Sequence, residues 1–211
     1  MEINSFITQY NKEVVKNKKN EWIVIHYTAN DGDTAKGNCN YFSKPLPKEK
    51  RASANYFVDE KYIWQCVEDE CIAWHVGAKT YYNDCRNANS IGIELCSRIN
   101  KKTGEYYIKE ETIRNAQILT AYLMERYNIK LDHVCRHYDV TRKVCPAPFV
   151  RHPEQWESFK AGIEWIDDLL YLKEQGRLNG ADRWVLKNYE QDGEIKYLIK
   201  KWAKDVKALT N

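Results

Sequence analysis

The stretch "NEWIVIHYTAN", residues 20–30, decides the fold. It holds an apolar run from Trp22 to Ile25, and His26 follows directly. A short apolar run rich in β-branched residues predicts a strand buried on both faces of a sheet. Catalytic and binding groups are often mounted where strands give way to loops. We therefore expect a strand over residues 22–26 and treat His26 as a candidate site residue.

Two more segments resemble this strand. "NSIGIELC" (89–96) predicts a second buried strand, and its Glu94 lies among Ile91, Ile93 and Leu95, where an unpaired carboxylate would be costly. "DHVCRH" (132–137) predicts a short strand that ends in His137. "SANYFVDEKYIWQCV" (53–67) has two strand-like halves around a polar turn and predicts a hairpin.

The clearest helix is "KEETIRNAQILTAYLMERYNI" (109–129), which places apolar residues on one face and two glutamates in its first turn. Residues 4–16 predict a short amphipathic helix, and residues 31–52 predict a helix and loop excursion. Strands separated by one long helix, with a hairpin between them, indicate an α/β fold: a central mixed β-sheet flanked by helices.

The chain becomes purely helical towards its end. "KAGIEWIDDLLYLKEQG" (160–176) predicts a helix closed by Gly176, and two further helices follow, broken near Asp192–Gly193. We therefore divide the chain into an α/β domain, residues 1–160, and a small C-terminal all-helical extension, residues 161–211. Aromatic residues at helical spacing in the extension, such as Trp165 and Trp202, are typical of core packing and could also stack on sugars.

Composition excludes several classes of protein. The 211 residues are 43% hydrophobic and 30% charged, with a formal net charge of +3, which fits a folded globular protein. This small charge gives no case for nucleic acid, and no apolar run approaches the roughly 20 residues that cross a bilayer. The first residues lack the pattern of a secretory signal, so we expect a cytoplasmic product that interacts with neither nucleic acid nor membrane.

Seven cysteines are many for this length, namely Cys39, Cys66, Cys71, Cys85, Cys96, Cys135 and Cys145. Without an export signal, reduced thiols with a metal-binding or catalytic role are the default expectation. Outside the cell, Cys66 and Cys71 would be candidates for a local disulfide.

His26, His137 and Cys145 form a candidate zinc set. Three protein ligands leave one tetrahedral position for water, as in catalytic zinc sites. Each residue also has an ordinary explanation, because a lone histidine is often a satisfied polar residue and a lone cysteine is often packing. His133 lies four residues before His137, but a strand would separate the two by about 13 Å, so we expect no metal role for it.

Together, "WIVIHYTAN", "AWHVGA", "NSIGIELC" and "HYDVTRKVCP" resemble the zinc-dependent N-acetylmuramoyl-L-alanine amidases of the type 2 family, over about residues 20–155. That family shares its fold with amidase-type phage lysozymes and peptidoglycan recognition proteins. The resemblance implies Zn²⁺ held by His26, His137 and Cys145. It further implies catalytic roles for Glu94 and Lys143, and substrate contacts from Trp74, His75 and Asn55.

The implied activity is hydrolysis of the amide between N-acetylmuramic acid and L-alanine in bacterial peptidoglycan. Together with the missing signal, it suggests a phage or prophage endolysin, made in the host cytoplasm and acting on the wall after release. Residues 161–211 would bind the wall, mediate homo-oligomerisation or brace the catalytic domain. The alternatives are a peptidoglycan-binding protein without catalysis, which Cys145 disfavours, and a cytoplasmic amidase that recycles muropeptides.

Overall fold

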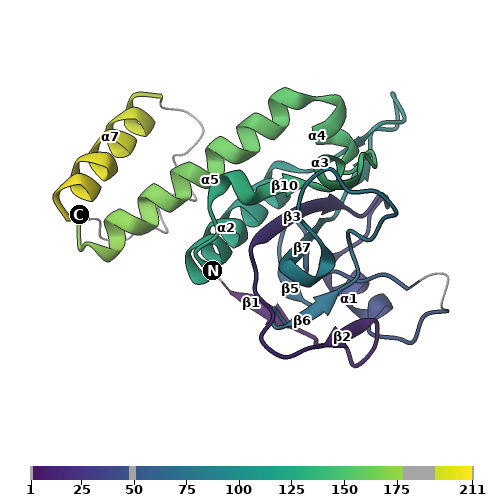
Figure 1. Ribbon diagram of the computed structural model, residues 1–211. Coiled ribbons are helices and arrows are strands. Elements are labelled where there is room, and N and C mark those ends of the chain that lie inside the picture. Colours follow the sequence, from purple (N-terminus) through teal and green to yellow (C-terminus); the bar gives the residue numbers. More distant parts are fainter. Residues whose placement is uncertain (1, 48–50, 178–192, 211) are drawn as a thin grey trace.

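The computed structural model describes residues 2–47, 51–177 and 193–210. Its centre is a six-stranded sheet of order β1-β5-β4-β7-β3-β10, in which β4 and β5 are antiparallel and all other neighbours are parallel (Figure 1). The predicted mixed sheet flanked by helices is therefore confirmed. The strands are β1 (Ile3–Ser5), β3 (Trp22–Tyr27), β4 (Tyr56–Val58), β5 (Ile63–Gln65), β7 (Ser90–Leu95) and β10 (Val134–Arg136).

The strands predicted from "WIVIH" and "NSIGIELC" are β3 and β7, which are neighbours inside the sheet. β3 pairs with β7 in parallel, so that Ile25 lies beside Ile93 and His26 beside Glu94. Successive side chains of a strand point to opposite faces. Ile25 and Ile93 therefore belong to the face that packs on helices, whereas His26 and Glu94 belong to the opposite face, which we call the site face.

Two helices cover the other face, α2 (Glu110–Tyr127) and α5 (Pro153–Glu174). Ile23, Ile25, Ile91 and Ile93 are fully buried in one apolar cluster with residues of both helices. The helices cross closely at Gly162, where an added Cβ would lie 2.1 Å from the Gln117 side chain. Gln117 in turn donates a hydrogen bond to the Phe159 carbonyl oxygen, so this face is closed by a tight helix–helix contact.

Short elements and loops surround the site face. The helices are α1 (Ala35–Phe42), α3 (His137–Thr141) and α4 (Ala147–Arg151), with 3-10 turns η2 (Asn87–Asn89) and η3 (Leu131–His133). Two small antiparallel pairs complete the domain, β2 (Lys12–Val14) with β6 (Cys71–Ala73), and β8 (Arg98–Ile99) with β9 (Tyr106–Tyr107).

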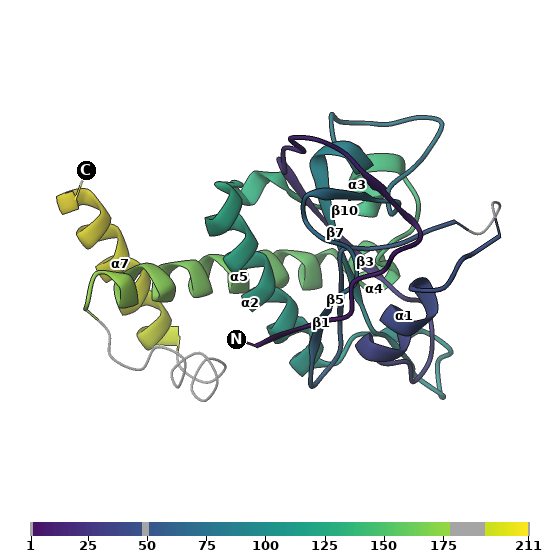
Figure 2. The same ribbon diagram turned by 90° about the horizontal axis from the view of Figure 1, so that it is seen from below.

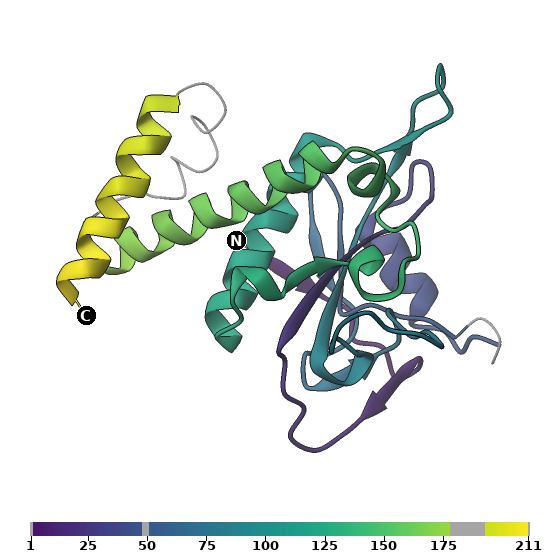
Figure 3. The same ribbon diagram turned by 45° about the horizontal axis from the view of Figure 1, so that its top comes forward.

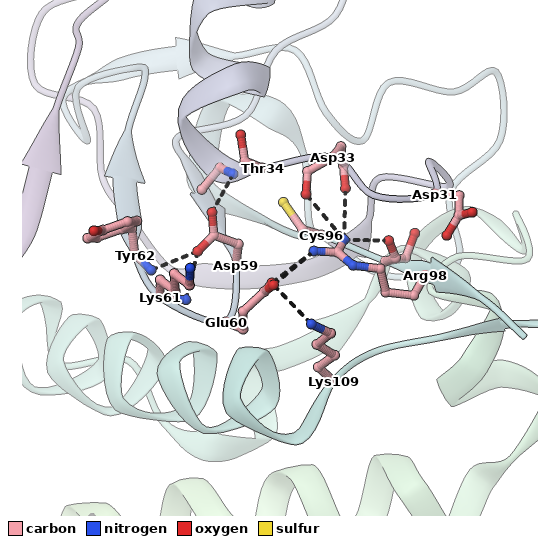
Figure 4. A network of polar contacts seen from close by, with 12 residues as sticks. Asp31, Asp33, Thr34, Asp59, Glu60, Lys61, Tyr62, Cys96, Arg98 and Lys109 are labelled. Carbon is pink, nitrogen blue, oxygen red and sulfur yellow. Dashed lines mark hydrogen bonds and ion pairs between the residues drawn. The ribbon is translucent and has the colours of Figure 1, made fainter.

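A polar network ties the start of α1 to the sheet and to α2 (Figure 4). The Asp59 carboxylate accepts hydrogen bonds from the backbone N–H groups of Ala35, Lys61 and Tyr62. Beside it, Glu60 pairs with Arg98 at 2.9 Å and with Lys109 at 3.0 Å. Because these partners come from four separate segments, the network holds the loops beside the site face in place.

The C-terminal part forms an arm. α5 extends away from the sheet, and α7 (Gly193–Thr210) packs at its far end (Figures 1, 2 and 3). Ala203 and Val206 of α7 are buried in the same cluster as the α5 side chains, and Lys200 pairs with Glu164 at 2.8 Å. The boundary expected between residues 160 and 161 falls inside α5, which is one continuous helix.

Two further predictions concern the end of α5 and the helices that follow it. Gly176 has a φ of +64°, and its N–H bonds to the Lys173 carbonyl oxygen at the end of α5, as expected of a closing glycine. The second of the two later helices is α7, while the first lies outside the described residues. None of the helices in the described ranges combines the length and the apolar character that crossing a membrane requires.

The helix predicted over residues 4–16 is wrong. The segment forms the edge strands β1 and β2, with Asn11 at a φ of +56° between them. The Asn11 amide donates to the carbonyl oxygens of Phe42 and Lys44, and Thr8 donates to the Tyr10 carbonyl oxygen. These hydrogen bonds and the strand partners outweigh the local helical pattern.

The cysteines are free and buried, all seven of them. Cys66 and Cys71 lie in separate apolar clusters, so the candidate bridge between them is not formed. His133 lies in η3 rather than in a strand, and its ring stacks on Trp22 with centroids 4.2 Å apart.

Candidate metal centre and cleft

Three predicted ligands converge on the site face. His26 Nδ1 lies 3.1 Å from His137 Nδ1 and 3.7 Å from Cys145 Sγ, and the ligand atoms of all three residues lie within 4.8 Å of one another. Zinc with bonds of about 2.0–2.3 Å and tetrahedral angles needs donor atoms about 3.3–3.7 Å apart. The distances from His26 Nδ1 to the other two donor atoms are close to this range.

The topology explains the convergence. β10 runs parallel to β3 with Arg136 beside Ile25, so both strands end at the same edge of the sheet. His26 lies near the end of β3, and His137 is the first residue of α3 directly after β10. Cys145 follows in the loop between α3 and α4, and its carbonyl oxygen accepts a hydrogen bond from the Tyr138 backbone N–H. Residues more than a hundred positions apart thus meet at one point.

The protonation of this group suits a metal. Burial, reinforced by the neighbouring His75, lowers the pKa of His26 well below its ordinary value, and burial with Lys143 nearby lowers the pKa of His137 to about 4. Both imidazoles are therefore neutral, as ligands must be. Burial raises the pKa of the Cys145 thiol to about 12, and a bound cation would release this proton. Two imidazoles and a thiol are a donor set that zinc prefers.

Glu94 lies beside His26 in the register of β7 and β3, on the same face. Its Oε2 atom is buried and has no hydrogen-bond partner among the described residues. Burial raises the pKa of Glu94 to about 8, against the opposing effect of Lys143. A partner for this orphaned oxygen is therefore expected from outside the described residues, because buried polar atoms are normally satisfied.

These side chains line one cleft with two lobes. An inner cavity of about 260 Å³ is lined by residues that include His26, Glu94, Cys145, Lys143 and Trp74. An outer cavity of about 530 Å³ shares Trp74, His75 and Lys143 with it. The structure therefore brings Lys143 and Trp74 to the same cleft as Glu94 and the three predicted ligands.

The other two predicted substrate contacts are placed differently. Asn55 is fully buried: its amide oxygen accepts from the Gly92 N–H, and its amide nitrogen donates to the Glu68 carbonyl oxygen. It lines neither lobe of the cleft. His75 lines both lobes but is only 9% exposed, and both its ring nitrogens contact protein atoms, His26 Nε2 and Ser90 Oγ.

Sequence reasoning missed two arginines of the outer lobe. Arg142 has a φ of +67° and lies over the Tyr82 ring at 4.5 Å, and Arg51 lies over the Trp74 ring at 5.9 Å. Neither has an ion-pair partner within the part of the chain that the structure describes. Sequence reasoning also missed Ser90. The signal was the nearby Gly92, because a glycine inside a strand often marks a place where another part of the protein comes close to the backbone.

The fold and the cluster of His26, His137 and Cys145 fit a site that can hold a metal, and comparison with known proteins identifies the family. Residues 16–148 match the family described as N-acetylmuramoyl-L-alanine amidase. The chain therefore belongs to this amidase family, which confirms the resemblance seen in the sequence.

Individual relatives agree. A probable N-acetylmuramoyl-L-alanine amidase of Bacillus licheniformis is 36% identical over 77% of this chain and 47% of its own length. The catalytic domain of XlyA superposes with a TM-score of 0.62 at 29% identity, covering 77% of this chain and 99% of that domain. A mutant endolysin from Bacillus subtilis gives 0.62 at 30% identity, covering 77% and 99%. The chain spans about half the length of the curated relatives it matches.

Proposed function

We propose that the protein uses Zn²⁺ to hydrolyse the amide between N-acetylmuramic acid and L-alanine in bacterial peptidoglycan. The observation that carries this proposal is the convergence of His26, His137 and Cys145 in one cleft with Glu94, whose Oε2 atom has no hydrogen-bond partner among the described residues. Three ligands leave one coordination position for the reaction, whereas a structural zinc site would use four protein ligands.

In this proposal, three groups carry out the hydrolysis: the metal, Glu94 and Lys143. Held by His26, His137 and Cys145, zinc would supply Lewis acidity and would lower the pKa of a water molecule in the site to roughly 7. Glu94 accepts a proton from the attacking water and returns it to the departing amine, a role that fits its position beside His26 in the same cavity. Lys143 lines the same cavity and offers positive charge to the carbonyl oxygen as the carbonyl becomes tetrahedral.

The charge of the cleft suggests how the substrate lies. The outer lobe is lined by Arg51, Arg142 and Lys143, without an acidic residue among its lining side chains. An N-acetylated glycan is neutral where the lactyl group is amidated, whereas the stem peptide carries carboxylates. Opposite charges attract most strongly where solvent is partly excluded. We therefore place the stem peptide in the outer lobe and the sugar on the other side of the metal.

The same observations support a proposal for the cellular role. Relatives of this fold include an endolysin, and we propose an endolysin role, with peptidoglycan as the partner and the wall as the site of action after release. A binding protein without catalysis would have no need of Glu94 with an unsatisfied buried oxygen. A recycling amidase would share the site, so only the substrate separates it from an endolysin.

For the C-terminal arm we propose a bracing role. α7 buries Ala203 and Val206 against α5, and Lys207 pairs with Asp168 at 2.9 Å. Deleting residues 178–211 should lower the melting temperature and leave pelleting with purified cell walls unchanged. Loss of pelleting would instead assign the arm to wall binding, and a change in sedimentation from dimer to monomer would assign it to oligomerisation.

One experiment tests the activity. Protein stripped of metal with a chelator and then reloaded with zinc is incubated with intact sacculi and, separately, with soluble muropeptides. We expect new L-alanine amino termini from sacculi only in the reloaded sample. Cleavage of soluble muropeptides alone would favour the recycling amidase, and zinc binding without new amino termini from either substrate would contradict the proposed activity.

A further inference from the structure

A chain of hydrogen bonds runs from the metal centre to the protein backbone. His26 Nε2 lies 3.0 Å from His75 Nδ1, and His75 Nε2 lies 3.1 Å from Ser90 Oγ. Ser90 Oγ donates to the Arg86 carbonyl oxygen at 2.6 Å. His26, His75 and Ser90 are all buried, so water does not compete for these contacts.

The end of this chain fixes its direction. A carbonyl oxygen only accepts, so the single proton of Ser90 points to Arg86. Ser90 Oγ must then accept from His75 Nε2–H. A neutral imidazole carries one proton, so His75 Nδ1 is an acceptor and takes the hydrogen bond from His26 Nε2–H. The remaining nitrogen, His26 Nδ1, is left with a free lone pair.

We infer that His75 and Ser90 are positioning residues, which hold His26 in the tautomer whose Nδ1 lone pair faces His137 and Cys145. The inference rests on the proposed zinc site and gives His75 a role other than substrate contact. In the metal-free protein, the hydrogen bonds already select Nδ1 as the atom of His26 that would bind a metal. A ligand held ready in this way binds metal more tightly, because outer partners typically change metal affinity 10- to 100-fold.

Two further features hold His75 in place. The Asn87 side-chain oxygen accepts from the backbone N–H groups of His75 and Val76, at 3.1 and 2.8 Å. Gly92 lies under the ring, where an added Cβ would come within 2.6 Å of His75 Cγ. The sheet thus leaves space at Gly92 for the imidazole that contacts His26, which accounts for a glycine in the middle of the central strand β7.

Zinc affinity, measured by competition with a chelating indicator, tests this inference without any substrate. Ser90→Ala removes the hydroxyl, and we expect zinc to bind about 10-fold more weakly or worse. Ser97→Ala is the matched control, because Ser97 is equally buried and donates to the Asn30 carbonyl oxygen but has no contact with His75. Equal zinc affinities in the two variants would overturn the inference.

A second pair of variants separates hydrogen bonding from packing. His75→Asn keeps a side-chain oxygen near the position of Nδ1, whereas His75→Leu fills similar space without an acceptor. We expect zinc affinity within about threefold of wild type for the first and a loss of about 10-fold or more for the second. Equal losses in both would contradict a role that depends on the acceptor.

The wild-type protein gives a test that needs no variant. Long-range ¹H–¹⁵N correlation spectra of the metal-free protein report which ring nitrogen of His26 carries the proton. We expect Nε2–H alone, and an Nδ1–H form would overturn the inference. Failure of the proposed activity would look different: peptidoglycan would stay uncleaved while zinc binding and the tautomer of His26 were as described.

Discussion

The two faces of the central sheet differ sharply, although the same strands supply both. On the helix face, β3 and β7 contribute Ile23, Ile25, Ile91 and Ile93, all fully buried beneath α2 and α5. On the site face, the intervening positions include His26, Gly92 and Glu94. The strands are apolar on the helix face, whereas on the site face they carry a buried imidazole, His26, and a carboxylate with one buried oxygen, Glu94.

This contrast separates stability from function. The helix face stabilises the fold through burial of apolar surface, which is the dominant favourable contribution to folding. The site face carries groups that are unfavourable in the empty protein, such as the orphaned oxygen of Glu94. Natural proteins commonly break local rules at functional sites and compensate elsewhere. Substitutions on the helix face should therefore act mainly on stability, and substitutions on the site face mainly on zinc binding and turnover.

The largest effect is expected from Cys145→Ser. A serine hydroxyl is a poor zinc ligand at neutral pH, so the bound zinc should fall from about one ion per chain to below about 0.1, with activity lost. Elemental analysis of the purified variant measures this. Cys71→Ser is the control, since Cys71 is a buried free cysteine outside the cleft and should retain the metal. A Cys145→Ser protein with full zinc would refute the assignment of this ligand.

Glu94→Gln should separate metal binding from turnover. The amide keeps the size of the side chain but cannot accept the proton of the attacking water. We expect the rate of amide cleavage to fall by about 100- to 10 000-fold while zinc content stays near wild type. Release of new amino termini from sacculi measures the rate. Wild-type turnover in this variant would exclude Glu94 as the base.

The sequence predicts the helix face well and selects three side chains that the structure brings together, for physical reasons. Apolar runs and the helical period of residues 109–129 are local signals, and strand ends locate His26 and His137 at loops. The edge strands of residues 3–14 could not be predicted, because their partners are distant backbone groups. The position of the His75 ring beneath His26 is equally non-local: it depends on the register of β7, the bond to Ser90 and the missing Cβ of Gly92.

A smaller effect, confined to stability, is expected on the helix face from Gly162→Ala. The new Cβ would meet Gln117 at 2.1 Å and displace the hydrogen bond of Gln117 to the Phe159 carbonyl oxygen. We expect the free energy of unfolding to fall by about 1–3 kcal/mol, as for other overpacked cores. Chemical denaturation measures this loss. Zinc affinity should not change, and a parallel loss of zinc would show that the two faces are coupled.

The smallest effect concerns the pH dependence of the metal-free protein. The pKa of Glu94 is raised to about 8 in the folded state by burial, whereas an unfolded chain has a value near 4.5. Between these values the unfolded state loses its proton first, so the contribution of Glu94 to stability is present at pH 4 and disappears as the pH rises to 8. Glu94→Gln has no such dependence.

The difference in unfolding free energy between Glu94→Gln and wild type should therefore grow with pH, in favour of the variant. Because Glu94 is only partly buried, we expect the variant to gain about 1–2 kcal/mol between pH 5 and pH 8. Denaturant titrations of both proteins in the presence of a chelator measure it, and other titrating groups cancel in the difference. With zinc bound the trend should vanish, because the cation favours the carboxylate and holds the pKa down. If the difference in unfolding free energy between the two metal-free proteins did not change with pH, Glu94 would be well solvated. The site face would then carry no destabilising carboxylate at this position.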